Sequence, residues 1–82
     1  MDDYKIEIPH FYCLEYSENV HKMHVDIDFR EPEIILTSSL INNWEKPFDK
    51  EILPINEKKR IIQNIYYYLL KNNSSERIKM EE

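Results

Sequence analysis

The sequence predicts an α+β domain in which an antiparallel β-meander of three to four strands packs one face against one C-terminal helix. Three observations support this fold class: an alternating stretch at 23–30, a continuous apolar run within 33–38, and a helical apolar stripe within 56–72. Strands send successive side chains to opposite faces, whereas helices repeat every 3.6 residues. A chain of 82 residues has room for one domain, 1–82, with one core.

The stretch at 23–30 alternates apolar and polar residues without interruption. In a strand, this pattern makes one dry face and one wet face. We expect the dry face to carry the core of the sheet. The apolar members are Met23, Val25, Ile27 and Phe29, and the polar members are His24, Asp26, Asp28 and Arg30.

The residues before this stretch indicate a hairpin. Strand formers fill 10–16, where Tyr12, Leu14 and Tyr16 are expected to share a face. Turn residues follow at 17–19, and because the chain has no glycine, Asn19 is the best candidate for a positive φ. Residues 10–30 therefore read as a β-hairpin whose second strand begins at Val20. Residues 4–8 are either a short edge strand or an extended tail.

After a break at Glu31-Pro32, residues 33–38 are interpreted as a third strand of the antiparallel meander. Their continuous apolar run favours a central or doubly covered position. Near the C-terminus, residues 75–80 alternate weakly and are either a short edge strand or a frayed tail.

Residues 39–54 are predicted to form a long irregular connection pinned to the core by apolar anchors. Long loops without secondary structure are often functional, so this connection is a first place to look for a site. The expected anchors are Leu40, Ile41, Trp44, Phe48, Ile52 and Leu53.

A helix is predicted over 56–72. Asn56 is a good N-cap, and Glu57 places negative charge at the positive end of the helix dipole. An asparagine is expected to replace the usual C-cap glycine near residues 72–73. The apolar stripe comprises Ile61, Ile65, Tyr68 and Leu69, with Ile62 at its flank.

Composition excludes several classes of protein. A net charge of −5 argues against general nucleic-acid binding, which needs clustered Lys and Arg. The absence of glycine excludes a glycine-rich phosphate loop. Cys13 has no cysteine to pair with, which indicates a reducing compartment. No signal peptide or span of ~20 apolar residues is evident, so we expect a soluble cytoplasmic protein that does not bind membranes.

Three candidate chemistries, namely metal binding, nucleophilic catalysis and acid–base catalysis, use residues that also fit ordinary structural roles. His24, Asp26 and Asp28, with His10 or His21, have the residue types of a metal site, but they also fit the wet face of a strand. Cys13 is a candidate nucleophile or a small core residue. A carboxylate pair drawn from residues 26–33 would need an enclosed pocket. We expect the structural alternative in each case, and hence no catalytic residue, metal or cofactor.

Binding to another protein is the favoured function. Trp44 and Phe48 in the connection and Tyr67 off the helical stripe are candidate interface anchors, although Trp44 and Phe48 would also suit closure of the core. Asp26 and Asp28 belong to an acidic set that would steer a basic partner. The other acidic residues of that set are Glu31, Glu33, Glu45, Asp49 and Glu51.

Two segments, Asn43-Trp44-Glu45-Lys46-Pro47-Phe48 and Glu57 to Ile65, resemble small bacterial immunity-type proteins encoded beside polymorphic toxins. The resemblance spans residues 20–70 and lies in size, layout, acidity and the loop tryptophan. It implies a protein that binds one toxin stoichiometrically and blocks its active site. The alternatives are a self-associating homodimeric domain, joined through an edge strand or through Tyr67 and Leu70, and a small metal-dependent hydrolase.

Overall fold

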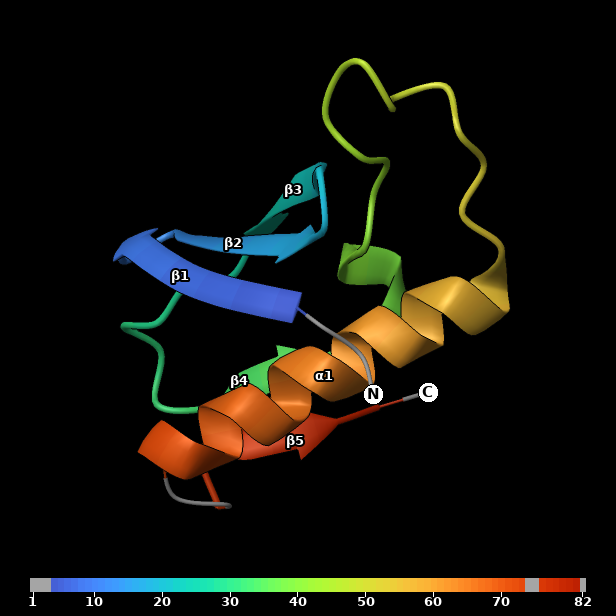
Figure 1. The fold of residues 1–82 in the computed structure, drawn as a ribbon. Helices are drawn as coiled ribbons and strands as arrows, with labels where there is room; N and C mark the ends of the chain where they lie inside the picture. The colour runs from blue at the N-terminus through green and yellow to red at the C-terminus, as the bar shows by residue number, and fades with distance from the viewer. Residues whose placement is uncertain (1–3, 74–75, 82) are drawn as a thin grey trace.

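The structure, a computed structural model, describes residues 4–73 and 76–81. Within these residues it has two small sheets, one α-helix and one 3₁₀ turn (Figure 1), which confirms the α+β prediction. The elements in chain order are β1 (Tyr4–His10), β2 (Cys13–Glu18), β3 (His21–Asp26), β4 (Ile34–Leu36), η1 (Ser38–Leu40), α1 (Ile55–Asn72) and β5 (Ile78–Met80).

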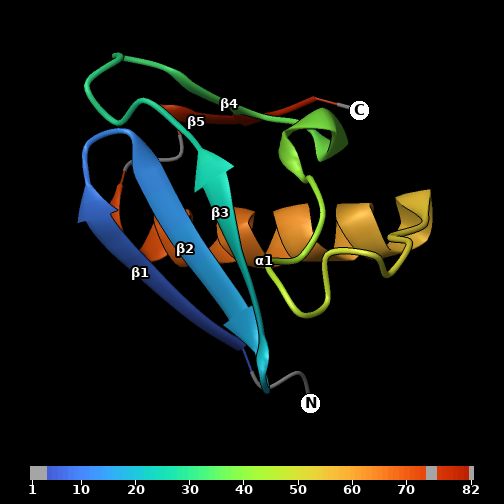
Figure 2. The ribbon, with the colours of Figure 1, turned by 90° about the horizontal axis from the view of Figure 1, so that it is seen from above.

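The larger sheet is an antiparallel meander in the order β1-β2-β3. Its register places Ile6 opposite Tyr16 and Leu14 opposite Val25. The second sheet pairs β4 with β5 in parallel, with Ile34 opposite Ile78. Figure 2 shows the meander in front of α1 and the two-stranded sheet along one side.

The meander does not contain residues 33–38, so that part of the prediction was wrong. Its third strand is β1, which settles the choice left open for residues 4–8. β4 instead pairs with β5, and the flanking bonds continue that pairing: the Ile34 amide donates to the Arg77 carbonyl oxygen at 2.8 Å, and the Glu81 amide donates to that of Leu36 at 2.9 Å. Ile35 is 44% exposed, so the strand is not central. Residue 75 lies outside the described residues.

The hairpin of β2 and β3 turns at Asn19, whose φ of 53° confirms the expected left-handed residue. β3 ends at Asp26 rather than Arg30. The cause is a local turn, because the Asp28 carboxylate accepts the Arg30 amide at 3.0 Å and competes with the ladder. The two-residue alternation in burial nevertheless persists to Ile27, which is buried.

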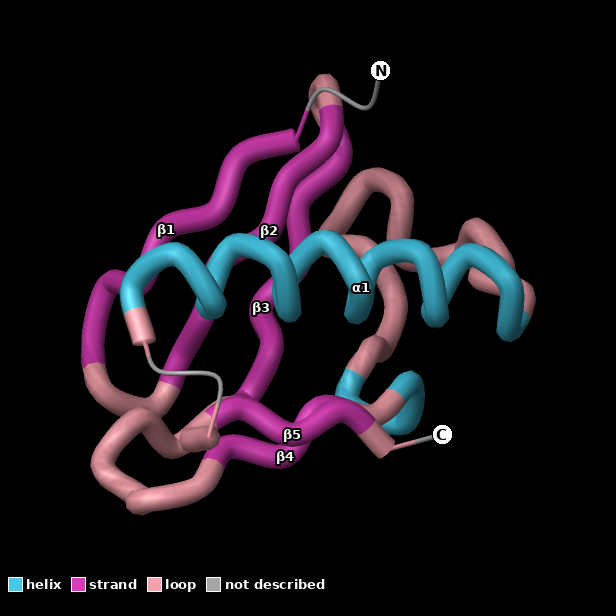
Figure 3. Tube along the Cα trace, turned by 90° about the horizontal axis from the view of Figure 1, so that it is seen from below, coloured by secondary structure: helices cyan, strands magenta, loops and turns pink. Residues whose placement is uncertain are grey.

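The core lies between the meander and α1, and Figure 3 shows the helix crossing β1–β3 and running beside β4–β5. The helix contributes Ile61, Ile62, Ile65 and Leu69, while Tyr68 packs at the margin of the core. Tyr12 is exposed because it occupies the β1–β2 turn, contrary to the face expected for it. The sheets contribute mainly Leu14, Tyr16, Met23, Val25, Ile34, Leu36 and Ile78.

The helix begins at Ile55 with Pro54 as its N-cap, not at Asn56. Pro54 has its φ fixed near −67°, and its carbonyl accepts the amides of Glu57 and Lys58 at 3.0 and 3.1 Å. Pro54 provides no side-chain cap at the N-terminus, whereas at the C-terminal end Asn73 Nδ2 donates to the Leu69 carbonyl oxygen at 3.1 Å. The C-cap residue is Asn73, so an asparagine does stand where glycine is usual, and its φ of −140° is extended.

The connection at 39–54 is irregular beyond η1, as predicted. Ile41 and Trp44 are buried, and Leu40, Phe48 and Leu53 pack partly against the core. Ile52 is 88% exposed, so the expectation that it anchors the connection to the core was wrong. Within the residues that the structure describes, no helix is long and apolar enough to cross a membrane.

Candidate protein-binding surface

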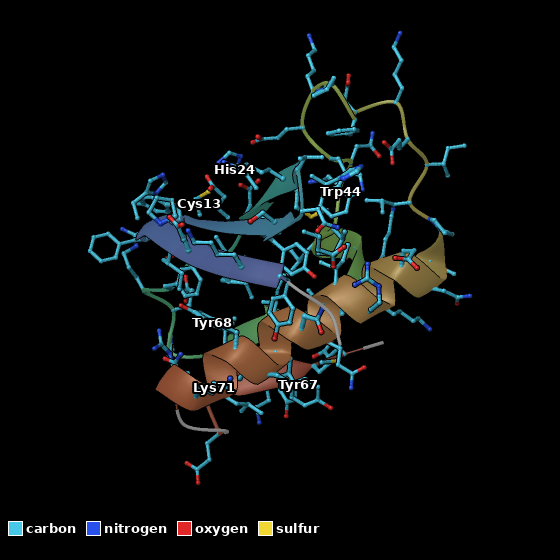
Figure 4. All side chains as sticks on the ribbon, viewed as in Figure 1. Cys13, His24, Trp44, Tyr67, Tyr68 and Lys71 are labelled. Atoms are coloured by element: carbon cyan, nitrogen blue, oxygen red, sulfur yellow. The ribbon has the colours of Figure 1, made fainter. Side chains whose placement is uncertain are left out.

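The structure separates the five expected partner-binding residues into three places. Asp26 and Asp28 lie at and after the end of β3, and Trp44 and Phe48 lie where the connection meets the start of that strand. Tyr67 is on α1. Figure 4 shows Trp44 and Tyr67 well apart, so these residues do not form one continuous anchor cluster.

Trp44 is only 6% exposed. Its ring stacks on Tyr16 with centroids 6.4 Å apart and meets His21 edge-on at 5.1 Å. Phe48 covers the other side of His21, with centroids 3.8 Å apart, and remains half-buried. The Glu45 amide also donates to the Lys22 carbonyl oxygen at 2.8 Å, which ties the connection to β3. These contacts favour the core-closing alternative for Trp44.

Tyr67 is 51% exposed on the solvent side of α1. Its hydroxyl accepts a hydrogen bond from Gln63 Nε2 at 2.9 Å. Leu70, its expected companion, packs partly against the core. Tyr67 is therefore an exposed aromatic in a polar surround rather than part of an apolar patch with Leu70.

Asp26 and Asp28 line a shallow surface hollow of about 150 Å³ together with Glu31 and Glu33. Apolar residues also line the hollow, among them the exposed Ile35. Arg30 forms a two-point ion pair with Asp28, at 3.1 and 3.2 Å, and its hydrogen bonds hold the pKa of that carboxyl below its usual value. The apolar lining residues are Ile27, Ile34, Ile35 and Leu40.

The acidic character continues onto the outer face of the meander. His24 Nε2 lies 3.2 Å from Glu15 Oε2, and His24 Nδ1 contacts Glu45. Asp26 follows His24 on the same face of β3. We call the combined region the acidic surface; it comprises Glu15, Asp26, Asp28, Glu31, Glu33 and Glu45.

Glu15 is the member of the acidic surface that sequence reasoning missed. It stands opposite His24 in the hairpin register. Pairing the two hairpin strands from the turn at Asn19 outward would have found it, since opposite residues on one face are neighbours.

A second polar cluster, also missed, joins the meander to the helix. Arg60 binds Glu18 through two hydrogen bonds of 2.6 and 3.0 Å and binds Glu57 at 2.7 Å. The Tyr16 hydroxyl donates to Glu18 and accepts from Asn64 at 3.0 Å. Burial would raise the pKa of Glu18, but the hydrogen bonds from Arg60 and Tyr16 outweigh it and lower the pKa. We call these residues the Glu18–Arg60 network.

Two structural observations bear on the candidate metal site and the candidate nucleophile. Across 4–73 and 76–81, no three His, Cys, Asp or Glu side chains gather closely enough to hold a metal ion. Cys13 is buried, and burial, followed by the charges of Asp26, Glu15 and Glu45, raises the pKa of its thiol. A raised pKa disfavours the thiolate that a nucleophile requires.

Comparisons with known proteins found no matching family model, no matching curated protein and no matching solved structure.

Proposed function

We propose that the chain is a non-enzymatic protein-binding domain whose acidic surface receives a basic partner. The observation that carries the proposal is the hollow at the end of β3, which is lined by Asp26, Asp28, Glu31 and Glu33 together with apolar residues. Protein interfaces usually combine apolar surface with neighbouring polar and charged groups.

The hollow suits a long basic side chain. The aliphatic stem of a Lys or Arg would lie along Ile35, and its charged end would reach the carboxylates of Asp26 or Glu33. A hollow of about 150 Å³ admits one such side chain rather than a whole substrate. Glu15 and Glu45 extend the negative field over the outer face and would speed association with a basic protein.

We propose further that the partner is a toxin domain, which this chain neutralises in the cytoplasm of a bacterium by occupying its active site. The support is the resemblance of residues 43–48 and 57–65 to immunity-type proteins, together with the acidic surface. A nucleic-acid-cleaving toxin would need a basic substrate groove, and an acidic protein is complementary to such a groove.

The test is calorimetric titration of the chain with the purified product of the adjacent gene. We expect a one-to-one complex whose affinity falls as salt rises. The charge reversals Asp26→Lys and Glu33→Lys should each weaken binding of the partner by at least about tenfold. Glu51→Lys is the matched control: it makes the same charge change beside His21, at the opposite end of β3.

Two results would overturn the proposal. One is no binding by the adjacent gene product under any salt condition. The other is a complex that Asp26→Lys and Glu33→Lys weaken no more than Glu51→Lys does. Co-expression with the toxin gives a second readout, because the two reversals, unlike the control, should abolish protection of growth.

A further inference from the structure

β1 is the open edge of the meander. It pairs with β2 on one side, and Figures 2 and 3 show no other described element beyond it. Its side chains Lys5, Glu7 and Ile8 are exposed. The opposite edge differs, because the connection binds β3 there through the Glu45 amide.

Two hydrogen bonds show which backbone groups of β1 face outward. The Ser17 hydroxyl donates to the Lys5 carbonyl oxygen at 3.5 Å, so that carbonyl points toward β2. On the far side of β2, the Tyr12 carbonyl accepts the Ile27 amide at 3.3 Å. Alternate residues of an antiparallel strand bond to opposite neighbours. Even-numbered residues from Tyr12 onward therefore bond to β3, and odd-numbered residues such as Ser17, which stands opposite Lys5, bond to β1. The amide and carbonyl of Ile6 therefore point away from β2, into open space.

We propose that β1 pairs antiparallel with β1 of a second copy of this chain, about a twofold axis at Ile6. In this register Ile6 stands opposite Ile6 of the second copy, and the two exchange both backbone hydrogen bonds. Lys5 then stands opposite Glu7 of the other copy, twice by symmetry. Tyr4 stands opposite Ile8.

Charge selects this register. Lys5 and Glu7 lie on the same outer face, where Lys5 Nζ already contacts Glu7 Oε1 at 2.9 Å within one copy. Pairing about Ile6 gathers two lysines and two glutamates in alternation. Moving the twofold axis by one residue, to Lys5 or to Glu7, would shift the pairing by two residues and place Lys5 opposite Lys5 or Glu7 opposite Glu7. A shift of the pairing by one residue would instead set inner-face residues opposite outer-face residues and misalign the two sheets.

The pairing also brings apolar side chains together at the two ends of the paired strands. Ile8 lies where the register of β1 against β2 shifts, between Glu7 and His10. Ile8 is apolar and 41% exposed in the single chain. Tyr4 is half-buried and stacks on Tyr16, with ring centroids 5.7 Å apart. The register lays Tyr4 against Ile8 of the second copy, which removes apolar surface from water at both ends of the paired strands.

The product is a continuous sheet of six strands with both α1 helices on the same face. Charged side chains, Pro9 and the register shift of β1 between Glu7 and His10 all discourage edge pairing. The association between the two copies is therefore weak and depends on concentration. It goes beyond the proposed function and is tested separately from it, because the hollow lined by Asp26, Asp28, Glu31 and Glu33 lies at the end of β3, on the opposite edge of the meander from β1.

The experiment is sedimentation velocity of the full chain from about 10 μM to about 1 mM. We expect a monomer–dimer equilibrium. Lys5→Glu and Glu7→Lys should each weaken dimerisation by at least about tenfold, because each replaces two attractive contacts with two repulsive ones. The double variant carrying both changes should restore it. Lys22→Glu, an exposed reversal on β3, is the matched control and should change nothing.

A monomer at every concentration would overturn the proposal. So would a dimer indifferent to the single reversals, or a folded double variant that stays monomeric. Circular dichroism and the urea midpoint of each variant establish that it is folded. These readouts need no partner protein, so their failure is distinct from failure of the proposed function.

Cysteine cross-linking tests the register directly. Across the dimer, Lys5 and Glu7 form a non-hydrogen-bonded pair with Cα atoms about 4.5 Å apart, which a disulfide can span. A mixture of Lys5→Cys and Glu7→Cys chains should cross-link under mild oxidation, and neither variant alone should do so efficiently. Lys5→Cys alone cross-linking as well as the mixture would contradict the register. Cys13 is buried and contributes little background.

Discussion

Replacing Arg60 with methionine should destabilise the fold by removing the cation at the centre of the Glu18–Arg60 network. Arg60 holds Glu18, on β2, through two hydrogen bonds of 2.6 and 3.0 Å. Methionine keeps much of the aliphatic stem and the helix propensity. The change therefore isolates the charge that links the meander to the helix.

The burial of the pair sets the size of the effect. The side chains of Arg60 and Glu18 are 32% and 17% exposed. Exposed pairs contribute about 0–1 kcal/mol, whereas breaking a fully buried pair costs about 3–5 kcal/mol. Because Tyr16 still donates to the Glu18 carboxylate in the variant, we expect an intermediate loss of about 2 kcal/mol.

Urea unfolding monitored by Trp44 fluorescence measures this loss as a change in the midpoint at constant m-value. Lys71→Met is the matched control, since it removes an exposed cation from the same helix and should cost less than about 0.5 kcal/mol. A double-mutant cycle with Glu18→Gln should give a coupling energy of about 1 kcal/mol or more. A coupling below about 0.5 kcal/mol, or an Arg60→Met loss equal to that of the control, would refute the assigned role.

Two further predictions concern acid stability and the connection. Because the pKa of Glu18 is lower in the folded chain than its ordinary value of 4.5, its stabilising contribution is full above that value and is lost as pH falls below it. The difference in unfolding free energy between wild type and Glu18→Gln should thus shrink from pH 5 to pH 3, and a constant difference would count against the ionised pair. Ile41→Ser should cost about 3 kcal/mol because Ile41 is buried. Ile52→Ser should cost less than about 0.5 kcal/mol because Ile52 is 88% exposed; similar losses in urea unfolding would show that the connection is packed differently.

Features governed by the local geometry of the chain were readable from the sequence. The alternation of Met23, Val25 and Ile27 identified the buried side of β3, and the absence of glycine singled out Asn19 for the positive φ at the turn. The stripe containing Ile65 identified the core face of α1. A side-chain period depends only on backbone geometry, so it survives whatever the rest of the fold does.

The sequence did not show which strands pair with each other. Residues 34–36 have strand composition, but nothing near them in the chain shows that they pair with residues 78–80 rather than with the hairpin. Both strands are three residues long, which is too short for a periodic signal. The same apolar character describes Ile41, which is buried, and Ile52, which is exposed.

The candidate binding residues show the same difference between local pattern and tertiary contact. Asp26 was identifiable as a wet-face residue from alternation, but Glu15 joins it through the pairing of β2 with β3. Trp44 has the composition of an interface anchor, and the structure places it in the core against Tyr16. The sequence by itself thus determined the α+β class, the hairpin, the helix and which of their faces are apolar, because these follow from short-range geometry. The tertiary structure decided which strands meet and which aromatic and charged side chains stay at the surface, because those outcomes depend on contacts between residues far apart in the chain.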